Sequence, residues 1–508
     1  MRKHLLLISL MALLLACLYL PGGTPHPLPT KTPWSTATAS PTPEPPLPPS
    51  PPAIDWADRS LFSPALRESQ QSALESLPPL SIYNLVLVLD EDMQHLTGLE
   101  EIYYTNNEGM PLDSLWLGLF PEILGGQIEI GSVRLDGASV TPERSTGMLR
   151  IPLDPPLEAG AARLLSIEFS VTIPSHGSDY YYGIFGYNEG VLSLAHAYPT
   201  VLVYDQQGWN NALPDTDGDP LFSDAAFYYV TVDAPANQVL VASGVEIDRS
   251  QTGSRQTVRY VNGPGRDFYL AASPNFRRIS ATENDVTIHS YYLAGASQSA
   301  AQSALETARA SIAIFSDLFI PYPYTEFDIV PISTSAGGVE YPGLTAVNLS
   351  YYYGNDPFLE EVVTHEVGHQ WFYNLVGNDT QDEPYLDESL TQYNTCLYYA
   401  QRYGPSSGET CLNNLRFYSS LASEPGLPIG LAVNQYTSQD YVAIIYGKGA
   451  FFFDALQQRL GEAAYQALMR DYSQAFAWGI GYTADFQALA EQHCNCDLDD
   501  LFEEWVHP

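Results

Sequence analysis

The pattern of apolar positions divides the chain into two halves. From Ser81 to about Ser273, short apolar runs that partly alternate with polar residues are separated by turn residues, which is typical of β-strands. From Ser297 onward the apolar residues recur with helical spacing over longer segments. We therefore expect an α+β protein, with an N-terminal all-β domain over residues 81–275 and a mainly helical domain over residues 276–508. The all-β domain is expected to be a sandwich or a saddle-like sheet.

The same pattern predicts individual elements within each half. A short helical lead-in is expected over residues 56–80. The expected strands are Ser81–Leu89, Gln127–Val133, Leu164–Ile173, Tyr228–Val232, Val239–Val241 and Thr257–Val261. The expected helices are Ala300–Phe319, a segment from Asp356-Pro357 to Val376, a segment from Pro384 to Tyr403, Ala450–Arg459, Ala463–Tyr472 and Thr483–His493. Gly377 and Gly404 are the expected stops of the second and third helices.

The N-terminal residues have the composition of an export signal followed by a spacer. Residues 1–20 join a short positive stretch to an almost wholly apolar run, which is typical of a signal peptide. The sequence Leu14-Leu15-Ala16-Cys17 resembles a lipoprotein cleavage box with lipidation at Cys17, and ordinary cleavage or an uncleaved anchor are the alternatives. Residues 21–55 are rich in Pro, Ser and Thr, which predicts an extended tether. We expect an exported protein in the cell envelope or on the extracellular face.

The charge balance excludes several classes of partner. Lys and Arg number 21 against 59 Asp and Glu, for a formal net charge of −38. Nucleic-acid binding needs a basic surface, and binding to anionic lipid needs polybasic segments. We therefore expect no nucleic-acid partner, and membrane contact only through an N-terminal lipid or signal anchor. Lysine is confined to Lys3, Lys31 and Lys448, so its one occurrence beyond the tether stands near the motifs described next.

A metal-binding motif lies in the second predicted helix. The segment His365-Glu366-Val367-Gly368-His369 is an HExxH motif, and positions i and i+4 of a helix can direct both imidazoles to one ion. Glu366 stands where a carboxylate can act as general base toward water on the metal. Glu388 follows His369 by 19 positions, on the next predicted helix, and can supply a third ligand. These residues predict one Zn²⁺ per chain with an open coordination position.

Four segments together carry a family resemblance. They are Thr364–Phe372 around the HExxH motif, Tyr385–Leu390 around Glu388, Gly337–Tyr341, and Tyr446-Gly447-Lys448-Gly449. Over residues 80 to 508 the chain resembles a gluzincin zinc metallopeptidase of the aminopeptidase N and leukotriene-hydrolase family. The resemblance implies a thermolysin-like zinc catalytic domain over residues 276–508.

The resemblance also implies roles for single residues. His365, His369 and Glu388 would bind Zn²⁺, and Glu366 would polarise the attacking water. Tyr446 would stabilise the oxyanion of the tetrahedral intermediate. Glu340 would bind the free α-amine of a peptide, with Gly337 and Gly338 beside it in the substrate-binding segment. The implied function is a zinc-dependent aminopeptidase that acts on peptides with a free N-terminus.

Departures from the family pattern keep other functions open. Val339 stands where the family has Met, and Tyr341 stands where it has Asn. Many relatives also contact the amine with a Gln or Glu from the β domain, but residues 193–198, where we expect it, contain neither. A zinc endopeptidase, an epoxide hydrolase on the same site and a noncatalytic binding protein are the alternatives. Because the sequence ends soon after the catalytic domain, we expect longer peptides to reach the site easily. The preferred N-terminal residue and the oligomeric state stay open.

The cysteines and one acidic segment complete the expectations. Cys396 and Cys411 lie eight residues before and seven residues after Gly404, so a helical hairpin at that glycine would pair them. The sequence leaves open whether Cys494 and Cys496 pair with each other. The segment Asp215–Asp219 lacks the final Glu of a calcium loop and is expected to be a solvated loop.

Overall fold

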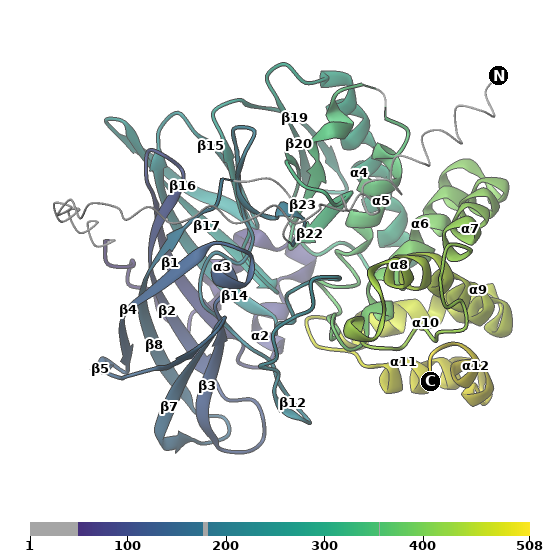
Figure 1. Ribbon diagram of the computed structural model, residues 1–508, viewed down its shortest axis with the longest axis horizontal. Helices are drawn as coiled ribbons and strands as arrows, with labels where there is room; N and C mark the ends of the chain where they lie inside the picture. Colours follow the sequence, from purple (N-terminus) through teal and green to yellow (C-terminus); the bar gives the residue numbers. More distant parts are fainter. Residues whose placement is uncertain (1–48, 176–180, 355, 508) are drawn as a thin grey trace, which may run out of the picture. The chain divides into compact units, whose positions relative to one another are not determined.

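A computed structural model describes residues 49–175, 181–354 and 356–507. The described residues all belong to the compact unit Pro48–Pro508. The predicted signal over residues 1–20, Cys17 and the tether up to residue 48 lie outside the described residues. Within the described part, strands fill one half and helices the other (Figure 1). The expected α+β class, with an all-β region before a mainly helical one, is confirmed.

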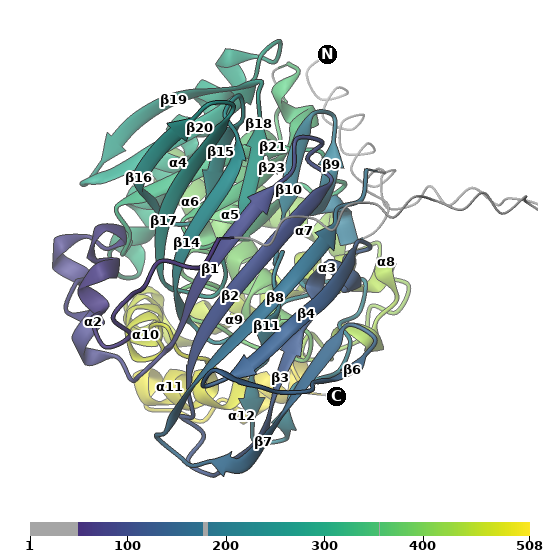
Figure 2. The same cartoon turned by 90° about the vertical axis from the view of Figure 1, so that its left-hand side faces the viewer.

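An eight-stranded sheet is the largest element of the β half (Figure 2). β1 pairs in parallel with β14, and the other neighbours are antiparallel. The predicted strand at Ser81–Leu89 is found with the same bounds. In spatial order the strands are β16 (Val245–Thr252), β17 (Arg255–Gly265), β14 (Ala226–Pro235), β1 (Ser81–Leu89), β2 (His95–Thr105), β8 (Ala162–Thr172), β4 (Gln127–Leu135) and β5 (Ala138–Ser139).

Smaller sheets cover this large sheet and close one core with it. Buried Leu87 of β1, Leu115 of β3 and Leu270 of β18 belong to one apolar cluster, so side chains from different sheets share the interior. Two sheets have four strands and one has two. They are β15 (Val239–Ala242), β18 (Leu270–Ser273), β10 (Val191–Leu194) and β9 (Phe185–Asn188); β11 (Thr200–Val201), β3 (Leu112–Gly118), β7 (Met148–Leu157) and β6 (Glu143–Ser145); and β12 (Tyr204–Asp205) with β13 (Gly208–Trp209).

Several short helical turns lie outside the long helices. The short helical lead-in expected over residues 56–80 contains two 3₁₀ turns and a single α-helical turn. These elements are η1 (Arg59–Ala65), η2 (Glu68–Gln70) and α2 (Ala73–Ser76), and further along the chain α3 (Phe120–Ile123) and η3 (Tyr181–Gly183).

The helical half begins with a five-stranded sheet on which helices pack. Helix α4 (Gln298–Leu318) packs on one face of this sheet, where Ile288 and Phe327 join its apolar residues in a second core. The opposite face contributes Val330 and Ile332 to the core of the β half. In spatial order the strands are β19 (Phe276–Glu283), β20 (Val286–Leu293), β21 (Glu326–Ile332), β23 (Leu344–Asn348) and β22 (Gly338–Tyr341). Strand β22 is therefore an edge strand.

The remaining helices follow the predicted order with one correction. The second predicted helix, α5, ends at Gly368 and not at Val376. The chain turns back there, with Tyr373 at a φ of 125°, and the Tyr373 carbonyl accepts a hydrogen bond from buried Arg266 instead of continuing a helix. The elements are η4 (Leu349–Tyr352), α5 (Leu359–Gly368), η5 (Pro384–Leu386), α6 (Glu388–Tyr403), α7 (Pro405–Ser419), η6 (Val433–Gln435), α8 (Ser438–Tyr441), the π-helix η7 (Val442–Lys448), α9 (Gly449–Leu460), α10 (Glu462–Ala475), α11 (Thr483–Cys494) and α12 (Asp499–Trp505).

Two disulfides tie the helical half. Cys396 of α6 is bonded to Cys411 of α7, as the hairpin at Gly404 predicts. Cys494 is bonded to Cys496, which answers the question that the sequence left open. Among the described residues, no helix combines the length and the apolar character that a membrane crossing needs.

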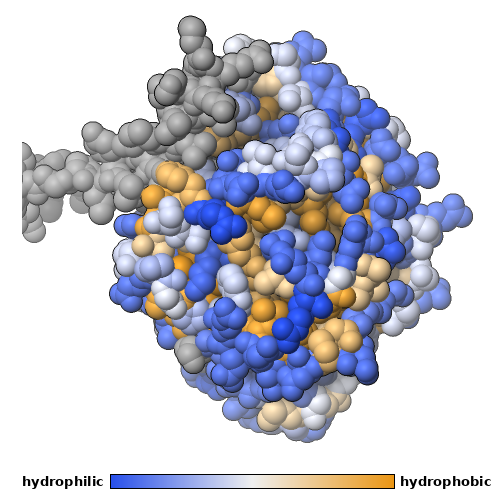
Figure 3. Space-filling model, turned by 90° about the vertical axis from the view of Figure 1, so that its right-hand side faces the viewer, coloured by the Kyte–Doolittle hydropathy of each residue, from blue (hydrophilic) through white to orange (hydrophobic). Residues whose placement is uncertain are grey.

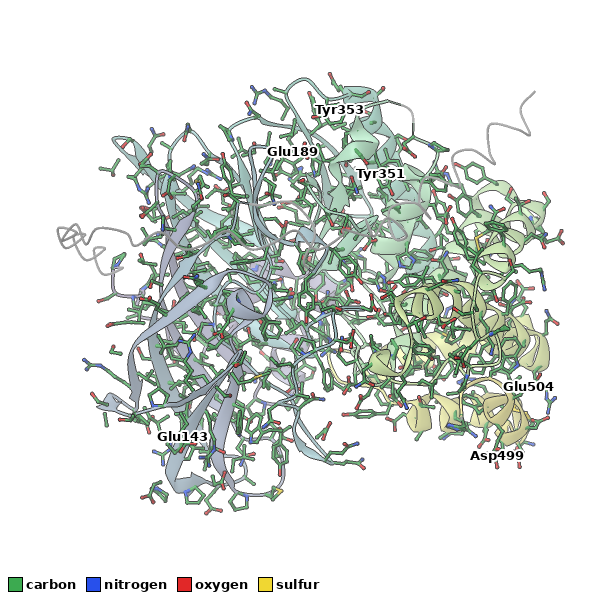
Figure 4. All side chains as sticks on the ribbon, in the orientation of Figure 1. Glu143, Glu189, Tyr351, Tyr353, Asp499 and Glu504 are labelled. Carbon is green, nitrogen blue, oxygen red and sulfur yellow. A yellow bond between two sulfur atoms is a disulfide. The ribbon has the colours of Figure 1, made fainter. Side chains whose placement is uncertain are left out.

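The surface carries the negative charge on both halves. Glu143 and Glu189 lie on the β half, Asp499 and Glu504 lie on α12, and all four are exposed (Figure 4). The face formed by the helical half is mainly hydrophilic, with apolar side chains visible in the hollows between (Figure 3). The acidity is therefore spread over the surface and is not confined to one element.

Candidate active site

Three nitrogen and oxygen donors meet where α5 packs against α6. His365 lies on α5, His369 caps its end, and Glu388 is the first residue of α6. The Nε2 atoms of His365 and His369 are 3.0 Å apart, and Glu388 Oε2 lies 3.1 Å from the first and 3.5 Å from the second. Tetrahedral zinc with ligands at about 2.0–2.2 Å needs ligand atoms about 3.3 Å apart. The donor triangle therefore fits one zinc ion.

A second carboxylate orients one imidazole of the triangle. Asp387 is fully buried, and its Oδ1 lies 2.6 Å from His369 Nδ1. The carbonyl of Phe372 lies 3.0 Å from the same nitrogen. Partners on Nδ1 leave Nε2 directed toward the triangle, and such outer contacts raise the basicity of a ligating histidine. Asp387 therefore places a carboxylate behind this ligand.

The site concentrates acidic side chains. Burial raises the pKa of Glu366 to about 8, against the opposing effect of His369. Burial also raises the pKa of Glu340 well above its usual range, and the nearby charge of Asp219 adds to the rise. Burial acts in the same direction on Glu388, but hydrogen bonds from His365 and His369 hold its pKa below the ordinary value. So many buried carboxylates favour positive charge in the space between them.

Glu366, the predicted general base, lies close to Gly338 at the start of β22. Glu366 is 5% exposed, and its Oε2 has no hydrogen-bond partner among the described residues. A Cβ on Gly338 would lie 2.6 Å from Glu366 Oε1, so only glycine leaves room for that carboxylate. Gly337 is less constrained, because a Cβ there would lie 3.2 Å from a methyl group of Val362. Gly338 therefore lets the edge strand β22 approach the carboxylate of Glu366 closely.

The two neighbours in β22 point to opposite sides. Glu340 faces the site, where one of its oxygens lies within 4.8 Å of donor atoms of Glu366 and His369. Tyr341 is 1% exposed and stacks on Tyr269 at a ring-centroid distance of 4.0 Å in the core of the β half. Tyr341, one of the two residues in this segment that depart from the family pattern, therefore packs away from the site.

A π-helix delivers Tyr446 to the donor triangle. Its hydroxyl donates a hydrogen bond of 2.6 Å to Glu388 Oε1. The hydroxyl of Ser389 donates to the carbonyl of Ile445, at 2.6 Å, and ties α6 to the π-helix directly before Tyr446. Short π-helical segments are frequent at functional sites because they displace one residue from the regular helical ladder.

Lys448 has a supporting place beside the site. Its Nζ donates to the carbonyls of Leu427 at 2.6 Å and of Pro425 at 3.4 Å. The ammonium group thus holds the loop between α7 and η6 against the end of the π-helix. It does not belong to the donor triangle.

Asp219 is a site residue that the sequence analysis missed. One of its oxygens lies within 4.8 Å of carboxylate oxygens of Glu340 and Asp387. The side chain of Gln381 fixes the segment, because Nε2 donates to the Asp219 carbonyl at 2.7 Å and Oε1 accepts from the Asp215 amide at 2.7 Å. The segment Asp215–Asp219 is a loop, as predicted, and Thr216 is exposed, but Asp219 faces the acids of the site and is not simply solvated. No signal within the loop reveals this, since Gln381 lies 162 residues further along the chain.

Comparison with known proteins agrees with this geometry. Residues 303–505 match the Peptidase family M1 domain. The chain is similar to rice "Aminopeptidase M1-A", with 25% identity over 73% of this chain and 43% of that protein, and to mouse "Aminopeptidase B", with 30% identity over 37% of this chain and 32% of that protein. The chain thus spans less than half the length of these relatives.

Solved structures share the fold. A crystal structure of an M1 zinc metallopeptidase from Deinococcus radiodurans superposes with a TM-score of 0.65 at 21% identity, over 84% of this chain and 93% of that one. A mutant of that Deinococcus metallopeptidase has been solved with a Tyr-Ser-Ala substrate. Residues 303–505 thus match the Peptidase family M1 domain, and the fold of the described residues is similar to that of M1 zinc metallopeptidase structures.

Proposed function

We propose that this chain, whose residues 303–505 match the Peptidase family M1 domain, is a zinc-dependent aminopeptidase that removes N-terminal residues from peptides. The observation that supports this proposal is the triangle of His365 Nε2, His369 Nε2 and Glu388 Oε2, with edges of 3.0–3.5 Å. The carboxylates of Glu340 and Asp219 lie beside it. The triangle would hold one Zn²⁺, and the two carboxylates would hold a substrate ammonium group.

The protein's own residues supply the proton transfers and charge stabilisation. A bound zinc ion acts as a Lewis acid toward the scissile carbonyl and acidifies water. Glu366 Oε2, which has no partner among the described residues, accepts the proton of the attacking water and later passes it to the leaving amine. The hydroxyl of Tyr446, placed at the edge of the donor triangle, donates to the oxyanion as its charge develops.

The carboxylates of Glu340 and Asp219 would select the free amino terminus of a peptide. Glu340 and Asp219 lie within 4.8 Å of each other, and neither acid has a cationic partner of its own in a hydrogen bond or ion pair among the described residues. An α-ammonium group would neutralise them, whereas an internal peptide amide would leave them uncompensated. The edge strand β22 offers backbone groups for pairing with an extended peptide. This arrangement favours removal of one residue at a time, and peptides with a free N-terminus are the proposed substrates.

The test compares free and N-acetylated substrates. Wild type should hydrolyse aminoacyl anilides and lose activity with a chelator, and Glu366→Gln should be inactive with zinc retained. Asp219→Asn removes one charge-assisted contact, so kcat/KM for free-amine substrates should fall roughly 10- to 100-fold. Asp217→Asn, in the same loop, is the matched control and should change little. Equal turnover of free and N-acetylated peptides would contradict amine recognition and would favour an endopeptidase.

We also propose that the protein is exported and is held at the cell envelope, with lipidation at Cys17 as the anchor. The N-terminal sequence motivates this proposal, and the disulfides Cys396–Cys411 and Cys494–Cys496 support it, since disulfides persist in oxidising compartments. Fractionation of cells with labelled fatty acid tests it. Wild type should carry the label in the membrane fraction, and Cys17→Ser should lose it.

A further inference from the structure

A cluster of potential ligands lies outside the candidate active site, on the catalytic sheet. His289 of β20 is paired in register with Asp328 of β21, and Glu326 stands two positions earlier on the same face of β21. One ligand atom from each of the three lies within 4.8 Å of the others. That face is directed to the core of the β half, because Val330 and Ile332, which alternate with the same phase, are buried there.

Asp328 is a buried carboxylate with one oxygen that no described residue bonds. The residue is 3% exposed, and its Oδ1 has no hydrogen-bond partner among the described residues. Tyr260 of β17, across the interface, is 4% exposed, and its hydroxyl is also without a partner there. Arg278 of β19 is the basic group whose charge reaches Asp328, but it does not bond the orphaned oxygen. Buried carboxylates are ordinarily paired or bind metal ions.

His289 is already held in the orientation of a metal ligand. Its Nδ1 lies 2.7 Å from the hydroxyl of Ser280, which leaves Nε2 facing the acids. Nε2 lies 3.4 Å from Glu326 Oε2. Two ligands of one tetrahedral zinc ion stand about 3.3 Å apart, and ligating histidines ordinarily have their other nitrogen bonded.

We infer that His289, Glu326 and Asp328 form a second metal site for a divalent transition-metal ion, distinct from the triangle at His365. One imidazole and two carboxylates suit Zn²⁺ or Mn²⁺, and the half-exposed Glu326 gives access from solvent. An ion there would neutralise the orphaned oxygen of Asp328. It would also cross-link β20 to β21 where this sheet meets the β half, so its role would be structural.

Zinc counting tests the site. Purified protein is equilibrated with excess Zn²⁺, freed of unbound metal and measured by elemental mass spectrometry. Wild type should hold two zinc ions per chain, and His289→Gln or Asp328→Asn should hold one. Glu283→Gln, an acid-to-amide change on the same sheet, should still hold two. A single ion in wild type, with no loss in the variants, would overturn the inference.

Two further measurements distinguish metal binding at the second site from metal binding at His365 and from misfolding of the variants. In a His365→Gln background, added Zn²⁺ should raise the melting temperature, and Asp328→Asn in the same background should abolish the rise. If Asp328→Asn instead stabilises the protein without altering zinc content, Asp328 is simply protonated and the site does not exist. Crystals of wild type soaked in Zn²⁺ should give an anomalous peak between His289 and Asp328. A peak at His365 and His369 alone would refute the second site and leave the proposed peptidase function intact.

Discussion

Glu100 gives a prediction that depends on a single buried proton. The residue lies in the middle of β2, is 0% exposed, and neither carboxylate oxygen has a hydrogen-bond partner among the described residues. Its neighbours in register, Leu85 and Ile167, are also fully buried. Burial raises the pKa of Glu100 well above its ordinary value. The folded protein therefore holds this proton to a higher pH than the unfolded chain does.

The size and sign of the effect follow from proton linkage. An unfolded glutamate has a pKa of about 4.3, and one proton contributes about 1.36 kcal/mol per pH unit. Because the folded pKa is raised, the contribution of Glu100 to stability is complete below about pH 4.3 and is lost as the pH rises toward the folded pKa. Between these two pKa values the loss grows by about 1.36 kcal/mol for each pH unit. Glu100→Gln has no proton to exchange, so it should match wild type near pH 4.5 and become more stable than wild type by about 1.4 kcal/mol for each pH unit above that, up to the folded pKa.

Thermal unfolding of both proteins from pH 4.5 to 8 measures this difference. At roughly 2–4 °C per kcal/mol for a unit of this size, the melting temperature of the variant should rise above that of wild type by about 3–5 °C for each pH unit above pH 4.5, up to the folded pKa. Glu129→Gln, on the exposed face of β4, is the matched control and should show no such slope. A difference that stays constant with pH, or a variant less stable at pH 7, would refute the reasoning.

Three further predictions concern the candidate active site. Gly338→Ala should lower kcat/KM at least 100-fold with normal zinc content, because its Cβ would displace the Glu366 carboxylate; steady-state kinetics with zinc analysis checks this. Asp387→Asn should weaken zinc affinity about 10- to 100-fold by removing the charge behind His369, as competition with a chelator would measure. Lys448→Arg should reduce activity and melting temperature more than an average surface change, because a planar guanidinium cannot reproduce the ammonium contacts to two loop carbonyls; an unchanged variant would contradict this interpretation.

The sequence predicted those features that depend on local pattern. Strand β1 has the predicted bounds, and the glycine at Gly404 ends α6 at Tyr403 as expected. The predicted end of α5 is wrong because the apolar pattern continues through Trp371 and Val376, which are buried although they no longer belong to a helix. Periodicity reports burial and cannot distinguish a helix from a buried turn.

Contacts between distant segments are what the sequence could not reveal. The zinc ligands are an exception, because the HExxH motif and Glu388 fall at spacings that already imply one site. The turn after α5 is fixed by Arg266, which lies 107 residues before the carbonyl it binds. The direction in which Tyr341 points depends on the pairing of β22 in its sheet. Such long-range registers are properties of the folded chain and leave no local pattern.

Asp219 comes from a different part of the chain than the metal donors. Under the proposed function, metal affinity and the choice of substrate end group would therefore depend on different segments. The metal donors come from α5 and α6, whereas Asp219 comes from a loop of the β half. If the chain is the proposed aminopeptidase, changes in that loop would alter which end group is accepted and would leave the affinity for the ion unchanged. Natural variation, or directed evolution restricted to residues 215–219, would then change selectivity while the residues that hold the ion stay the same.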